Sequence, residues 1–256
     1  MEKRQSDGIG FMAGRWPLTE AKSTLVFIHG SGGSAQFWLA QVQDLVERAN
    51  TLAIDLPGHG DSQGDGQNTV EGYAAVINEF LDDINPPGPV PCGLSLGGAI
   101  VQQLLLDYPD RFSAGVLIGT GARLKVLPAI FESIQNDFDG FAEMITGFAA
   151  SNKTEPAVIR RFQDDLVRCR PTVVSGDFQA CDQFDVMARL QDIRVPVLII
   201  SAEDDKLTPP NYADYLESSI PHAVRAHIAD AGHIVPLEKP RAVNRAIIEF
   251  LNHHGL

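Results

Sequence analysis

Short apolar runs alternate along the chain with segments of helical periodicity. The runs predicted to be strands are Thr24–Ile28, Thr51–Ile54, Pro89–Cys92, Ala114–Ile118, Val195–Ile200 and Val224–Ile228. The segments with helical spacing of apolar residues are Gln36–Arg48, Thr69–Ile84, Leu96–Tyr108, Pro210–Ser219 and Pro236–Leu251. Buried strands that alternate with helices are typical of a parallel sheet covered on both faces. The pattern therefore predicts an α/β fold with a mostly parallel central sheet.

One stretch, residues 123–190, contains no strand-like run and has the pattern of several short helices. Three prolines, Pro128, Pro156 and Pro171, separate these helices. If the helices merely extended the core, their apolar residues would have no sheet to cover. We therefore expect a small helical lid over the carboxyl ends of the strands, where loops and ligands gather. Residues 1–122 and 191–256 then form the core.

Composition narrows the classes of partner. The chain has 256 residues and a formal net charge of −13, which argues against nucleic-acid binding because phosphates need clustered Lys and Arg. The N-terminal MEKRQSDGIG lacks the apolar core of a signal peptide, and VPVLII is far shorter than the ~20 residues of a membrane span. The three cysteines (Cys92, Cys169 and Cys181) form no CxxC pair, which is typical of a reducing compartment. We expect a cytoplasmic protein without a membrane partner.

The strongest chemical signal is Gly93-Leu94-Ser95-Leu96-Gly97, a G-x-S-x-G pattern between an apolar run and a helical pattern. This placement is the one that a nucleophile turn requires, and it favours function over a chance match. Small neighbours let the strand and the helix pass close together while the serine is held in strained backbone geometry. Ser95 is therefore the candidate nucleophile.

A serine hydroxyl needs a base to take its proton and a third group to hold that base. The run Val195–Ile200 leads into the acidic residues 203–205, and the run Val224–Ile228 leads into a Gly-His pair that contains His233. Acid and histidine thus follow the serine in the order Ser, acid, His. His233 is the candidate base, and one of the three acidic residues is its partner.

Five segments in order, FIHGSGG, IDLPGHGDS, CGLSLGG, IISAEDDKLTPP and ADAGHIVPLEKP, resemble the α/β-hydrolase superfamily over nearly the whole chain. The resemblance implies a catalytic triad of Ser95, Asp205 and His233, with Asp204 as the alternative acid. It also implies an oxyanion hole made by the backbone N–H groups of Ser31 and Leu96.

The resemblance further implies structural roles for two other histidines. His29 is expected to brace the loop of the oxyanion hole. His59 is expected to belong to a turn whose hydrogen bonds Asp55 and Ser62 close. The spacing of the histidines matches no metal motif, and GxGxxG is absent, so neither a metal nor a cofactor is predicted.

Together these features predict a serine hydrolase that cleaves a small carboxylic ester or a related acyl substrate through an acyl-enzyme. The segment CGLSLGG also resembles 3-oxoadipate enol-lactonases, so a small lactone is an alternative substrate, as is the substrate of a carbon–carbon bond hydrolase. A non-enzymatic small-molecule receptor that keeps the triad is the alternative of another class. The sequence does not indicate the oligomeric state.

Overall fold

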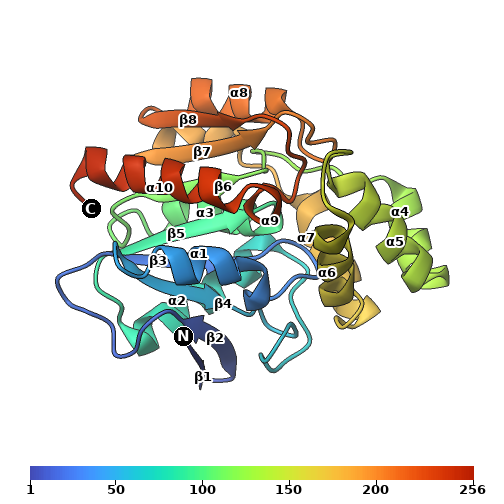
Figure 1. Ribbon diagram of the computed structural model, residues 1–256, viewed down its shortest axis with the longest axis horizontal. Helices are drawn as coiled ribbons and strands as arrows, with labels where there is room; N and C mark the ends of the chain where they lie inside the picture. Colours follow the sequence, from blue (N-terminus) through green and yellow to red (C-terminus); the bar gives the residue numbers. More distant parts are fainter.

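An eight-stranded sheet runs through the computed structural model, which describes residues 1–256 (Figure 1). Its strands are β1 (Glu2–Ser6), β2 (Ile9–Ala13), β3 (Thr24–Ile28), β4 (Asn50–Ile54), β5 (Pro89–Leu94), β6 (Gly115–Ile118), β7 (Val197–Ala202) and β8 (Ala223–Ile228). They lie in the order β1-β2-β4-β3-β5-β6-β7-β8. The first two pairings are antiparallel and all the others are parallel. The predicted mostly parallel sheet is confirmed.

Helices cover both faces of this sheet (Figure 1). They are α1 (Leu39–Asp44), α2 (Val70–Ile84), α3 (Leu96–Asp107), α8 (Pro210–Ser219), α9 (Val235–Glu238) and α10 (Pro240–His254). Side chains alternate between the faces of a strand, so Leu25 and Phe27 of β3 pack toward α1 and α10, while Val26 and Ile28 pack toward α2 and α3. The two apolar layers fix the sheet rigidly beneath the loops that follow its strands.

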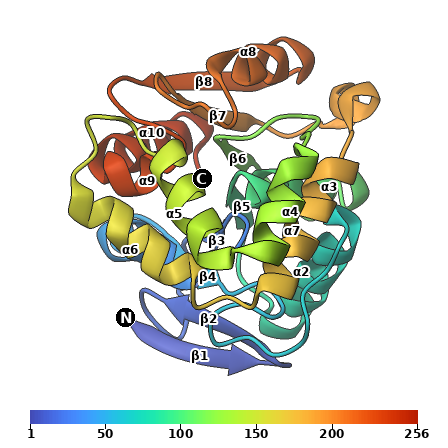
Figure 2. The ribbon, with the colours of Figure 1, turned by 90° about the vertical axis from the view of Figure 1, so that its right-hand side faces the viewer.

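Residues 123–190 contain four helices: α4 (Pro128–Asn136), α5 (Phe138–Ala149), α6 (Pro156–Leu166) and α7 (Pro171–Gln183). We call this segment the insertion. It lies in front of the ends of β3 and β5 in Figure 2, and eight buried side chains from α4 to α7 form an apolar cluster of their own. Ala149 O accepts a hydrogen bond from the backbone N–H of His233 (2.7 Å), after β8. The insertion thus contacts a loop at the carboxyl edge of the sheet, and its role as a lid stays a prediction.

The sequence pattern missed the hairpin of β1 and β2. β1 has the exposed, charged sequence EKRQS, which gives no apolar run, although β2 is buried throughout. The signal that would have found the hairpin is Asp7-Gly8, whose φ angles of 43° and 79° fit a tight two-residue turn.

Two predicted helices are shorter or divided in the structure. The segment Gln36–Arg48 begins as a 3₁₀ turn (Ala35–Trp38) and continues as α1, which already ends at Asp44. The segment Pro236–Leu251 is divided between α9 and α10, because Pro240 has no N–H to continue the first helix and instead begins the second. A second 3₁₀ turn, Met187–Asp192, precedes β7. None of the helices combines the length and the hydrophobicity needed to cross a bilayer.

Candidate active site

Ser95 occupies the turn between β5 and α3 in a strained conformation. Its φ of 55° and ψ of −116° are sparsely populated for a residue with a side chain. A Cβ atom at Gly93 would overlap Gly97 O, and one at Gly97 would overlap Ile28 O. The glycines on both sides of Ser95 are therefore needed for the close approach of strand, helix and neighbouring strand, as the G-x-S-x-G pattern predicted.

Backbone hydrogen bonds fix Ser95 against the neighbouring strands. Its N–H donates to Ile118 O at the end of β6 (3.0 Å), and its carbonyl oxygen accepts from Thr120 Oγ1 (2.8 Å). On the other side, Gly30 after β3 lies so close that a Cβ there would be 3.3 Å from Ser95 Cβ. Ser95 is half-buried and sits centrally at the carboxyl edge of the sheet.

His233 and Asp205 form a buried pair between the loops after β8 and β7. His233 Nδ1 lies 3.0 Å from Asp205 Oδ2 and 3.1 Å from Oδ1, and each residue is 4% exposed. A carboxylate only accepts hydrogen bonds, so Nδ1 carries a proton, and Nε2 is the nitrogen left to act as a base. Thr208 supports the carboxylate, with its N–H donating to Oδ1 (2.9 Å) and its hydroxyl to Oδ2 (2.8 Å).

The surroundings of Asp205 favour its charged form. Burial alone raises the pKa of this carboxyl, but the adjacent His233 and the hydrogen bonds from Thr208 outweigh burial and hold the pKa below its ordinary value of 3.8. The neighbouring Asp204 points elsewhere and accepts from Ser151 Oγ (2.5 Å). Of the two aspartates that the sequence left open, only Asp205 hydrogen bonds His233.

Gly119 connects the serine turn to this pair. A Cβ at Gly119 would lie 3.3 Å from Leu94 Cδ1, 3.3 Å from Asp205 Oδ2 and 3.4 Å from His233 Nδ1. The residue before Ser95 and the Asp205–His233 pair therefore meet at one point of the sheet edge. No hydrogen bond joins Ser95 Oγ to His233 in the structure. In many hydrolases this bond is long without substrate and shortens in the complex.

Of the two predicted oxyanion donors, Leu96 follows Ser95 directly, and Ser31 follows Gly30, which packs against Ser95. Leu96 is the first residue of α3, where a backbone N–H has no acceptor within the helix. The Ser31 N–H donates no hydrogen bond within the chain. His29 braces this loop, as expected. Its Nε2 accepts from Leu56 N–H (3.0 Å), which leaves the proton on Nδ1 to bond Gly30 O (2.8 Å).

His59 has a partner that the sequence analysis missed. Asp55 and Ser62 do close the turn, since Ser62 Oγ donates to Asp55 O (2.6 Å). The His59 ring, however, bonds Asp177 on α7, with 2.9 Å from Nε2 to Oδ2. The signal was present: Asp177 occupies a helical stripe of otherwise apolar buried positions, Val173, Val174, Ala180 and Cys181. An acid in such a stripe indicates a buried polar partner.

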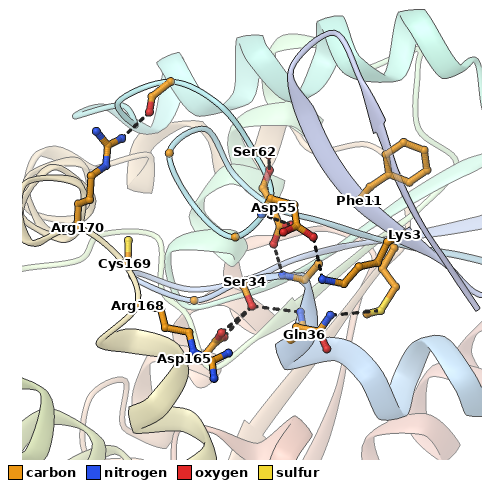
Figure 3. A pocket seen from close by; sticks show the side chains of 17 residues that line it. Lys3, Phe11, Ser34, Gln36, Asp55, Ser62, Asp165, Arg168, Cys169 and Arg170 are labelled. Carbon is orange, nitrogen blue, oxygen red and sulfur yellow. Dashed lines mark hydrogen bonds and ion pairs between the residues drawn. The ribbon is translucent and has the colours of Figure 1, made fainter.

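A separate pocket of about 470 Å³ lies beside the loop after β3 (Figure 3). Ser95, Asp205 and His233 do not line it. Several of its polar side chains are engaged with one another or with backbone, for example Ser34 Oγ with Asp165 (2.8 Å) and Asp55 with the N–H of Ala35 (2.6 Å) (Figure 3). The pocket is therefore part of the support of that loop and is distinct from the Ser95 site.

Residues 25–246 match the model of the alpha/beta hydrolase family. The chain belongs to this family. It is 24% identical over 234 residues to 3-oxoadipate enol-lactonase 2 of Acinetobacter baylyi, covering 88% of this chain and 87% of that protein. It is 29% identical over 239 residues to the pimeloyl-[acyl-carrier protein] methyl ester esterase of Aromatoleum aromaticum, covering 84% and 93%.

A comparison with solved structures also indicates the α/β-hydrolase fold. The structure of a thermophilic esterase superposes with a TM-score of 0.85 and 32% identity over 99% of this chain and 98% of that one. The predicted α/β-hydrolase fold is thereby confirmed. The chain is a hydrolase of this fold that resembles esterases and enol-lactonases.

Proposed function

We propose that this protein hydrolyses small carboxylic esters by acyl transfer, with Ser95 as nucleophile, His233 as general base and Asp205 as the acid that orients the histidine. The observation that carries the proposal is the buried Asp205–His233 pair at the same sheet edge as a serine held at φ 55°. A neutral imidazole with its proton on Nδ1 is the tautomer that can take a proton from a serine.

In the first step, Ser95 Oγ attacks the ester carbonyl while His233 Nε2 takes the hydroxyl proton. The carbonyl oxygen becomes an anion, and the N–H groups of Ser31 and Leu96 are the donors that face it in this proposal. Collapse of the intermediate breaks the ester C–O bond, and His233 gives its proton to the leaving alkoxide. The alcohol departs and Ser95 remains acylated.

In the second step, water attacks the acyl carbon while His233 takes one of its protons. The bond to Ser95 Oγ breaks, His233 returns the proton to the serine, and the carboxylic acid leaves. Asp205 stays ionised throughout, in keeping with its lowered pKa, and stabilises the imidazolium that forms in each step.

A lactone is the second candidate substrate, because a curated relative covering 88% of the chain is an enol-lactonase. The chemistry at Ser95 is unchanged, but the alcohol stays attached to the acyl group. Turnover of lactones well above that of acyclic esters of similar size would support this alternative.

The proposal is tested by hydrolysis of p-nitrophenyl acetate and butyrate by the wild type, Ser95→Ala and a control, Ser218→Ala, which alters a serine on α8. We expect Ser95→Ala to lose a factor of about 10⁴ or more in kcat/KM, since a triad without its nucleophile retains little activity. The control is expected to match the wild type. Full activity in Ser95→Ala contradicts the proposal, and fluorophosphonate labelling of Ser95 without turnover of esters or lactones favours a receptor.

A further inference from the structure

Asp177 on α7 has a fully buried carboxylate that receives hydrogen bonds from three different parts of the core. Its Oδ1 accepts from Tyr73 Oη on α2 (2.5 Å), and its Oδ2 lies 2.9 Å from His59 Nε2. The third bond comes from the backbone N–H of Gly32, 2.8 Å from Oδ2. A buried carboxylate that collects donors from distant segments has a positioning role, because desolvating it is costly unless all of its bonds are made.

The charge of this carboxylate is balanced by His59. The His59 Nδ1 lies 3.0 Å from Pro57 O, a carbonyl that only accepts, while Nε2 faces the carboxylate. Both ring nitrogens therefore carry protons, and His59 is an imidazolium. Burial lowers the pKa of His59, but the charge and the hydrogen bond of Asp177 outweigh it and raise this pKa well above its ordinary value of 6.5.

Gly32 is one of the residues at which the insertion meets the loop after β3. Its φ is 67°, in the left-handed region, and a Cβ there would overlap Leu166 Cδ1 of α6 and lie 3.2 Å from Val174 Cγ2 of α7. The Ser31 N–H and the Gly32 N–H belong to consecutive peptide planes, which are joined at the Ser31 Cα. The orientation of the Gly32 N–H, which Asp177 determines, therefore also limits the rotation of the Ser31 peptide.

We infer that Asp177 is a positioning residue for catalysis, which holds the loop after β3 so that the Ser31 N–H faces the oxyanion formed at Ser95. The inference rests on the proposed acyl-transfer function. It makes the insertion part of the catalytic apparatus rather than only a cover. It also gives His59 a role: its positive charge offsets a carboxylate that would otherwise oppose a negative charge developing nearby.

A second carboxylate of the insertion binds the same loop and offers a matched control. Asp165 on α6 accepts from Ser34 Oγ with both oxygens (2.9 and 2.8 Å), as Figure 3 shows. This bond goes to a side chain three residues beyond Ser31, and not to a backbone N–H beside it. Asp165→Ala therefore removes an insertion–loop contact of the same chemistry while leaving the Gly32 N–H bonded.

The experiment compares the wild type, Asp177→Ala, Asp177→Asn, Asp165→Ala and Ser95→Ala. For every protein except Ser95→Ala, kcat and KM for p-nitrophenyl acetate are measured per active site, and active sites are counted by stoichiometric fluorophosphonate labelling. The activity of Ser95→Ala, which has no serine to label at this position, is measured per mole of protein. The affinity for phenylboronic acid is measured in parallel, because its adduct with a serine mimics the tetrahedral intermediate and places an oxygen in the oxyanion hole.

We expect kcat of Asp177→Ala to fall about 10- to 100-fold with KM nearly unchanged, less than the loss on removing an oxyanion donor outright. The affinity for the boronic acid should fall by the same factor, since the lost interaction acts only on the tetrahedral state. Asp177→Asn keeps a neutral acceptor for Gly32 and should retain more of kcat. If Asp177→Ala yields no labelled protein, the test uses Asp177→Asn, in which kcat and the affinity for the boronic acid should fall by the same, smaller factor.

The inference is overturned if kcat per labelled site in the Asp177 variants equals that of Asp165→Ala, or if kcat falls while boronic acid affinity stays at the wild-type value. Ser95→Ala distinguishes a failure of the positioning role of Asp177 from a failure of the acyl-transfer function. If Ser95→Ala is inactive and the Asp177 variants behave as Asp165→Ala, only the positioning role fails. If Ser95→Ala retains activity, the acyl-transfer function itself fails.

Discussion

The two sides of the Ser95 site are built in different ways. On one side, Asp205 is bound by Thr208, three residues along the same loop, and contacts His233 from the neighbouring strand end. On the other side, the loop after β3 is bound by Asp177 and Asp165, which come from the insertion more than 130 residues later.

The base and the oxyanion hole are therefore positioned by different parts of the molecule. The contact between the Asp205 carboxylate and the His233 ring lies within short loops on adjacent parallel strands, and the insertion reaches this side at the end of α5, where Ala149 O accepts from the His233 N–H. The β3 loop depends on whether α6 and α7 are docked, because the Asp177 carboxylate and the side chains of Leu166 and Val174 reach its backbone at Gly32. We therefore expect the base to tolerate changes in α6 and α7 and the oxyanion hole to be sensitive to them.

The largest effect is expected from Asp205→Asn. An amide at this position favours the wrong tautomer of His233, so kcat should fall by about 10⁴ while the fold is kept. The matched variant Asp204→Asn, whose carboxylate bonds Ser151 rather than His233, should stay close to the wild type. Steady-state kinetics with p-nitrophenyl acetate distinguish the two. A greater loss in Asp204→Asn would show that the acid has been assigned to the wrong aspartate.

An intermediate effect is expected from Gly32→Ala on the opposite side. A left-handed φ costs about 1–2 kcal/mol for a residue with a Cβ, and this Cβ would also overlap Leu166. We expect a drop of about 10-fold or more in kcat, because small displacements of an oxyanion donor are costly.

The double variant Gly32→Ala/Leu166→Ala sharpens this test. It removes the overlap with α6 but not the φ strain, and should recover part of kcat. No recovery would mean that the contact between α6 and Gly32 does not limit the position of the loop.

A smaller effect is expected from Thr208→Val, which removes one hydroxyl donor from Asp205 and leaves its two backbone donors in place. Partners that orient a catalytic or ligating side chain contribute about 10-fold, and a hydrogen bond to a charged group about 1.5–3 kcal/mol. Asp205 should then titrate at a higher pH, because a donor that favours its charged form is lost. The free energies of unfolding of the wild type and Thr208→Val are measured by chemical denaturation between pH 3 and pH 7, a range that brackets the ordinary Asp pKa of 3.8. The pH dependence of their difference reports the change in the pKa of Asp205.

The smallest expected effect is a pH dependence of stability that comes from His59. Its folded-state pKa is raised, so the ion pair with Asp177 stabilises fully below the unfolded pKa of 6.5, and this contribution is lost as the pH rises through the higher folded value. The Tm difference between the wild type and His59→Gln should therefore be larger near pH 6 than at alkaline pH. A difference that grows with pH would show that His59 is neutral in the folded protein. Two other titratable side chains lie near the ring. Cys169 also raises the pKa of His59, whereas His29 has a pKa held well below 6.5 by burial and by the charge of His59, so it stays neutral throughout this range.

The contrast between the two sides of the site also explains how much of the structure the sequence could predict. The sequence predicted six strands, the turn at Ser95 and the order of Asp205 and His233 along the chain. Each of these depends on a local pattern, namely buried apolar runs, glycines at fixed spacing and polar residues just after strands. The β1–β2 hairpin was missed because β1 is polar and exposed, and only Asp7-Gly8 indicates it. The position of Asp177 in an apolar helical stripe signals that its carboxylate is buried, but its partners Gly32, His59 and Tyr73 could not be predicted, because they are joined to it only by the docking of the insertion, which no spacing along the chain encodes.

The acyl-enzyme at Ser95 is the central claim, and rapid acid quench followed by mass spectrometry tests it most directly. The protein is mixed with excess p-nitrophenyl acetate, quenched within the first turnover and digested. We predict one acetyl group on the peptide that contains Ser95 in the wild type, and none on that peptide in Ser95→Ala or His233→Ala. Product formation without any acylated Ser95, or an acetyl group that survives in Ser95→Ala with undiminished turnover, would contradict it.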